Sequence, residues 1–101
     1  MAVQSFIKEP NEKYVVAVEY AGLSPTGETL VSGTVSALNL VTGTDATGTV
    51  LSSPTLTVAG TQAKATVRAG TSGTEYKLTF LTTWSGGSIL EDELLMAVVD
   101  L

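Results

Sequence analysis

The densest cluster of ionisable side chains in this 101-residue sequence is the acidic run Glu91-Asp92-Glu93 near its end. Carboxylates can bind calcium or act as a general acid and base. A calcium loop needs acidic residues at alternate positions and a glycine, and this run has neither. Neighbouring residues of a strand point to opposite faces, so the run does not provide the paired carboxylates of a glycosidase. We therefore predict that this run is exposed to solvent where a strand begins, and that its charges discourage pairing with another strand at the sheet edge.

Other residue types that carry chemistry are scarce. The sequence has no histidine and no cysteine, which removes the commonest general base, the commonest zinc ligand and any disulfide. Serines are plentiful, but none has an evident activating base. The segment Gly70-Thr71-Ser72-Gly73 has the glycines of a phosphate-binding loop, but such a loop needs a lysine and a following helix. We expect no enzyme activity, no catalytic, cofactor-binding or metal-binding residues, and no cofactor.

Four apolar or aromatic residues are candidates for a protein interface. Trp84 ends a strong strand pattern beside a glycine pair, so its ring either fills the end of a small core or serves as an exposed anchor for a partner. The opening segment, residues 1–8, carries Val3, Phe6 and Ile7. This segment is either an arm that reaches onto an adjacent subunit or a short first strand of the same domain.

The elements that position these residues are expected to be strands, because Val, Thr and Tyr alternate with a period of two between turn residues. The clearest strand covers residues 75–84, in which Tyr76, Leu78 and Phe80 face inward. Gly33 is expected to mark a bulge. The Glu and Leu content of residues 91–99 also permits a helix, but the preceding strand and tight turn favour a closing strand. The other expected strands cover residues 14–20, 28–39, 55–58 and 62–68, with one short strand around 49–51 in the loop 41–54.

The number and spacing of these strands predict the fold class. Six or seven short strands without a covering helix must bury one sheet against a second sheet. A chain of 101 residues closes one hydrophobic core. We predict an all-β fold, an immunoglobulin-like antiparallel β-sandwich, with residues 1–12 as an N-terminal arm or first short strand and residues 13–101 as the sandwich domain.

The charge balance restricts the class of partner. Charged residues make up 15% of the chain, fewer than the roughly 25% of an average soluble domain, so we expect neighbouring subunits to cover part of the surface. A net charge of −5 argues against nucleic acid or an anionic membrane as a partner. The opening residues do not read as a secretory signal, and no apolar run approaches the roughly 20 residues of a membrane helix. We expect a protein made in the cytoplasm and not exported.

Two stretches carry a resemblance to a known family. The first is Lys8-Glu9-Pro10-Asn11-Glu12, which leads into Tyr14 and a valine-rich strand. The second combines the glycines at 70 and 73, the alternating Tyr76, Leu78 and Phe80, and the closing acidic run. Both resemble the small virion proteins of tailed bacteriophages that have an immunoglobulin-like fold, of the fiber-tail adaptor or head-tail region type.

The resemblance implies a non-enzymatic structural protein of a bacteriophage virion. It implies an adaptor subunit at the tail or head-tail junction that acts through protein-protein interfaces. Its partners would be other virion proteins, namely tail, connector or capsid subunits, and further copies of itself in a ring or lattice, with no nucleic acid and no membrane. The implied location is the virion, after synthesis in the cytoplasm of the bacterial host. A capsid decoration (cement) protein and an immunoglobulin-like adhesin or carbohydrate-binding module are the alternatives.

Overall fold

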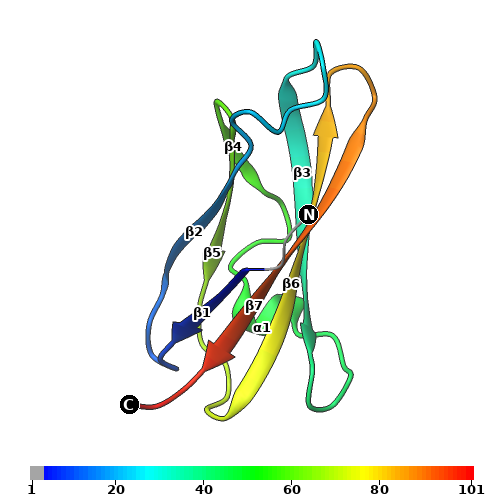
Figure 1. The fold of residues 1–101 in the computed structure, drawn as a ribbon. Helices are drawn as coiled ribbons and strands as arrows, with labels where there is room; N and C mark the ends of the chain where they lie inside the picture. The colour runs from blue at the N-terminus through cyan, green and yellow to red at the C-terminus, as the bar shows by residue number, and fades with distance from the viewer. Residues whose placement is uncertain (1–3) are drawn as a thin grey trace.

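The computed structural model describes residues 4–101, which form seven strands and one short helix (Figure 1). No helix in this range is long and apolar enough to cross a membrane. The elements in chain order are β1 (Gln4–Lys8), β2 (Tyr14–Glu19), β3 (Leu30–Asn39), α1 (Thr47–Val50), β4 (Thr57–Ala59), β5 (Gln62–Val67), β6 (Thr74–Trp84) and β7 (Ile89–Val98).

The strands form two sheets that face each other, with strand orders β1-β7-β6-β3 and β2-β5-β4 (Figure 1). The predicted all-β sandwich is therefore confirmed. The grouping of β3, β6 and β7 against β2, β4 and β5 is that of the immunoglobulin fold, in which successive strands repeatedly change sheets. One pairing departs from the antiparallel prediction, since β1 runs parallel to β7. The chain turns from β1 into the opposite sheet, so β1 meets the last strand and not the next one.

The hydrophobic core is built around β6, which pairs with β3 on one side and β7 on the other. Its alternate residues Tyr76, Leu78 and Phe80 are all buried, which confirms the predicted inward face. The hydroxyl of Tyr76 accepts a hydrogen bond from the N–H of Thr71 at 3.0 Å. This contact is the tyrosine corner of immunoglobulin-like folds, and it fixes the turn that enters β6.

The segment between β3 and β4 covers the free edge of β3. The prediction of a strand around residues 49–51 is wrong, because α1 is a single helical turn there. The N–H of Ala37 donates to Oγ1 of Thr47 at 3.0 Å, which draws this turn against β3. Backbone bonds to β3 continue from residue 44 to residue 56. This sheet edge is therefore protected, as exposed edges in native proteins generally are.

Gly33 lies within regular pairing, so the predicted bulge at this residue is wrong. The register shift of β3 falls between Leu30 and Ser32, while Gly33 pairs with Thr82. A Cβ atom at Gly33 would lie 2.6 Å from the carbonyl oxygen of Leu81 and 2.7 Å from Leu56 Cδ1. The glycine is needed because another backbone and a core side chain approach it closely.

Lys8, the last residue of β1, binds backbone carbonyl groups at one end of the sandwich, and we call this set of contacts the Lys8 clasp. The residue is 0% exposed, and its ammonium donates to the carbonyl oxygens of Glu9 at 2.7 Å, Pro10 at 3.3 Å and Ala69 at 2.5 Å. Burial lowers the pKa of this ammonium, and the charge of Glu12 opposes the shift. The contact with Ala69 ties β1 to the connection between β5 and β6.

Replacing the Phe80 ring tests the inward face of β6. We expect Phe80→Ala to lower the free energy of unfolding by about 3–5 kcal/mol, because a fully buried ring leaves a cavity. The exposed Thr83→Ala on the same strand is the control and should change stability by less than about 0.5 kcal/mol. Urea denaturation measures both. Equal losses for the two variants would contradict the assigned face.

Removing the ammonium of Lys8 tests the clasp. We expect Lys8→Met to lower the free energy of unfolding by at least about 2 kcal/mol, because buried carbonyl oxygens lose a charged donor. Lys13→Met, at an exposed lysine, should stay within about 0.5 kcal/mol of the parent. A Lys8→Met variant as stable as the parent in urea denaturation would show that the clasp contributes nothing.

Candidate protein interface

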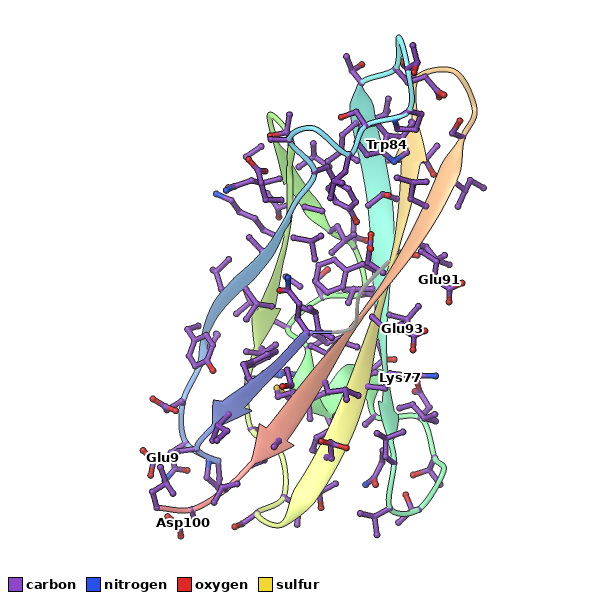
Figure 2. All side chains as sticks on the ribbon, in the orientation of Figure 1. Glu9, Lys77, Trp84, Glu91, Glu93 and Asp100 are labelled. Atoms are coloured by element: carbon purple, nitrogen blue, oxygen red, sulfur yellow. The ribbon has the colours of Figure 1, made fainter. Side chains whose placement is uncertain are left out.

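The acidic run lies in β7, and the strand distributes its side chains to both faces of the sheet. Glu91 and Glu93 lie on the outer face, the same face of the sheet as Lys77 (Figure 2). Glu93 forms an ion pair with Lys77, with 3.5 Å between Oε2 and Nζ. Asp92 is only 5% exposed and points between the sheets. The prediction of a solvated run is therefore wrong for Asp92, because the alternation of the strand turns every second residue inward.

Asp92 is held inside the sandwich by Tyr20. The hydroxyl of Tyr20 donates to Oδ2 of Asp92 at 2.6 Å, and the Tyr20 residue is 0% exposed. The Tyr20 ring also packs edge-on against Trp84, with 5.4 Å between the ring centroids. Nε1 of Trp84 in turn donates to Oγ1 of Thr82 at 3.0 Å. Each buried polar group of this cluster thus has a partner, as burial requires.

The environment of Tyr20 raises the pKa of its phenol. Desolvation by burial is the largest cause, and the hydrogen bond to Asp92 adds to it, while the contact with Thr82 opposes the shift. A phenolate here would lie beside a carboxylate in a dry site, so the neutral phenol is strongly favoured. The group acts as a hydrogen-bond donor and structural tie.

The arrangement of carboxylates does not resemble a metal site. Within residues 4–101 no three His, Cys, Asp or Glu side chains gather closely enough to hold a metal ion. Asp92 is bound to a tyrosine, and Glu93 is paired with a lysine. Hydrogen bonds and ion pairs of the fold therefore account for two of the three acidic residues.

Of the four predicted interface residues, the three that the structure describes do not form one surface. Val3 lies outside the described residues. Phe6 is half-buried and packs against Tyr14, with 6.4 Å between the ring centroids. Ile7 is 63% exposed on the outer face of β1. Trp84 is 2% exposed at the upper end of the sandwich (Figure 2), so it fills the core and is not available as an exposed anchor.

Two surfaces that the sequence analysis missed have the character of interfaces. The first is an uncharged hollow of about 400 Å³ on the outer face of the larger sheet, close to the exposed apolar residues Val31, Leu81 and Ile89. The alternation that places Phe80 inside places Leu81 outside, and this signal was present in the sequence. The hollow is lined by Ser32, Gly33, Thr34, Thr55, Leu81, Thr83 and Ile89.

The second surface is a groove of about 420 Å³ at the side of the sandwich, between β2 and β7. Its lining combines apolar residues with the acidic residues Asp92 and Glu93 of β7 and Glu19 of β2. No sequence signal predicts it, because it depends on which strands end up at the sheet edges. The groove is lined by Gln4, Ala17, Val18, Glu19, Leu23, Asp92, Glu93 and Leu94.

Comparison with known protein families gives one match over most of the chain. The family described as podophage GP4 fiber-tail adaptor protein gp77 matches residues 8–97. The match begins at Lys8, the residue of the clasp, and extends into the last strand. The comparison with curated proteins found no match.

The raised pKa of Tyr20 predicts how stability depends on pH. Above the ordinary tyrosine pKa of 10.0, the unfolded chain releases the phenol proton while the folded chain retains it. The stability that Tyr20 contributes is therefore present below pH 10 and declines as the pH rises further. Tyr20→Phe should show a shallower decline, and at pH 7 it should lose about 1–3 kcal/mol because Asp92 loses its donor.

Urea denaturation of both proteins at a series of pH values measures this difference. Tyr14 also has a raised pKa, so the matched control is Tyr14→Phe, which keeps the buried pair intact. An identical pH profile for the parent and Tyr20→Phe would contradict the account of the buried pair.

Proposed function

The chain belongs to the family of podophage GP4 fiber-tail adaptor proteins, and from this premise we propose that it is a non-enzymatic adaptor that joins the tail and its fiber through protein-protein interfaces. The family match over residues 8–97 is the observation that carries the proposal. It favours an adaptor at the tail over the capsid decoration protein and the adhesin module.

The composition and surface of the fold support a role in assembly. A chain with only 15% charged residues and several exposed apolar side chains has a surface suited to partial burial against neighbours. The buried apolar residues form one core cluster that includes alternate residues of β6, and a close-packed core of this kind can present rigid surfaces. Interfaces on strands are geometrically well defined, which suits an adaptor that must hold two assemblies in fixed register.

We further propose that copies of the chain contact one another through the uncharged hollow near Leu81 and Ile89. Each copy carries a net charge of −5, so a contact that brings acidic residues of two copies together adds to their repulsion. The lining of this hollow contains only uncharged residues. A ring or lattice built through this surface, inside the virion and after synthesis in the host cytoplasm, is the assembly that we infer.

Inactivating the gene in the phage that encodes this protein tests the proposed function. We expect a stop codon early in the gene to give particles that have heads and tails but lack fibers, because the link between tail and fiber is missing. These particles should fail to adsorb to host cells. Negative-stain electron microscopy and an adsorption assay measure the two effects.

A plasmid copy of the gene provides the control, since it should restore both fibers and adsorption. Particles with a full set of fibers and normal adsorption would contradict the proposal. Heads without tails would also contradict it, because they would place the protein at the head-tail junction.

A further inference from the structure

Among residues 4–101, only the lower half of β7 has a neighbour along the edge that faces away from β6. Strand β1 pairs with β7 from Leu94 to Val98, and Figure 1 shows it beside this lower half alone. Along the edge that faces β6, the upper half of β7, Ile89–Glu93, is paired. Within residues 4–101 no strand pairs with the other side of this upper half. We call these five residues the open edge of β7.

Among the described residues, none pairs with the outward-facing backbone groups of the open edge. The N–H of Val99 donates to the carbonyl oxygen of Lys8 at 2.9 Å, so Val99 turns its backbone groups toward β1. Because these groups alternate along a strand, Glu91 and Glu93 turn theirs to the same side. No part of β1 lies opposite Glu91 or Glu93. The open edge therefore presents N–H and C=O groups that an additional strand can pair with.

Apart from the edge of β2, the other described sheet edges are covered or short. Residues 44–56 cover the edge of β3, and β1 covers the lower half of β7. Strand β4 is only three residues long. Besides the open edge of β7, the edge of β2 remains, and it forms the opposite wall of the same groove. An added strand beside Ile89–Glu93 would thus insert its inward side chains between the two sheets.

The groove indicates which side chains such a strand would carry. Strand β1 runs parallel to β7 and places Gln4 opposite Leu94. In a strand that continues this pairing along the open edge, the next side chain on the inward face lies opposite Asp92. Asp92 is 5% exposed and lines the groove, with its Oδ2 bound to Tyr20. Val18, Leu23 and Leu94 supply apolar contacts, while the carboxylate of Glu19 accepts hydrogen bonds from Thr61 Oγ1 and faces away from the groove. A lysine or arginine opposite Asp92, with apolar residues two positions away, complements this lining.

A second copy of this chain does not supply such a segment from its described residues. Of the five basic residues, Lys8 is buried, Lys77 is paired with Glu93, and the guanidinium of Arg68 donates to Gly48. The remaining two are Lys13, in the turn before β2, and Lys64, within the paired strand β5.

We propose that the open edge of β7 is a docking site for one extended segment of another virion protein, which adds a strand beside Ile89–Glu93 and places a lysine or arginine opposite Asp92. Strand addition of this kind takes its affinity from backbone hydrogen bonds and its specificity from alternate side chains. The identity of the partner as a virion protein rests on the proposed function, whereas the site itself rests on the edge and the groove.

A synthetic peptide tests the site directly. The probe is acetyl-Ser-Val-Thr-Lys-Thr-Val-Ser-amide, which presents Val, Lys and Val at alternate positions in either strand direction. We expect saturable shifts of the amide resonances of Glu91, Glu93 and residues 17–19 when the full chain is titrated by NMR. The same peptide with Glu in place of Lys should bind at least about tenfold more weakly, because it would face Asp92 with a like charge.

Two proline variants separate strand addition from other binding. Glu91→Pro removes an N–H of the open edge without removing a bond to β6, and it should weaken binding at least about tenfold. Val15→Pro is the matched control, because it removes an unpaired N–H from the free edge of β2 outside the groove lining. The control should bind within about twofold of the parent. Unchanged dispersion of the remaining amide resonances verifies that both variants are folded.

Three results would overturn the proposal. They are the absence of saturable shifts at millimolar peptide, an equal loss of binding in both proline variants, and binding that appears only after residues 1–3 are deleted. The last result would mean that the chain fills the groove with its own first residues. Fiberless particles combined with no peptide binding would reject the site and keep the adaptor function. Peptide binding in a protein whose loss leaves the fibers intact would do the reverse.

Discussion

The hydrogen bond between Tyr20 and Asp92 joins the two sheets at the upper end of the sandwich. Immunoglobulin domains of antibodies hold this interior with a disulfide, and this chain has no cysteine. Here a neutral phenol, a carboxylate and the Trp84 ring occupy the space between the sheets. Because Tyr20 follows β2 and Asp92 belongs to β7, the bond sets the separation of these two strands. That separation is the width of the groove between them.

The alternation of a strand explains both the core and the exposed surfaces. In β6, the residues that build the core are separated by Lys77, Thr79 and Leu81, which form part of the outer face. In β7, the same alternation buries Asp92 and sends Glu91 and Glu93 outward. It also turns the backbone groups of Glu91 and Glu93 toward the unpaired side. The docking site, the neutral hollow and the packed interior therefore follow from one periodic pattern on two adjacent strands.

The parts of the fold that depend on local patterns could be predicted from the sequence. The alternation of Tyr76, Leu78 and Phe80 gave the inward face of β6, and the alternation of Val and Tyr over residues 14–20 gave β2. The helical turn α1 could not be predicted, because Thr47 is drawn to β3 by a contact ten residues away.

The candidate site was less predictable from the sequence than the fold was. The partner that Asp92 finds inside the sandwich, Tyr20, lies 72 residues earlier in the chain, and the groove depends on which strands lie at the sheet edges. The family resemblance was carried by the two ends of the domain, where the Lys8 clasp and β6 lie, and the family match covers both.

We infer that this sandwich links tail and fiber by accepting a strand from a neighbouring protein. A cryo-electron microscopy reconstruction of the tail and fiber base of the phage particle tests it most directly. The account predicts this domain at the joint between tail and fiber, with a strand of a different protein paired to Ile89–Glu93 and a basic side chain opposite Asp92. A reconstruction in which the domain is absent from this joint, or in which the open edge of β7 faces solvent, would contradict it.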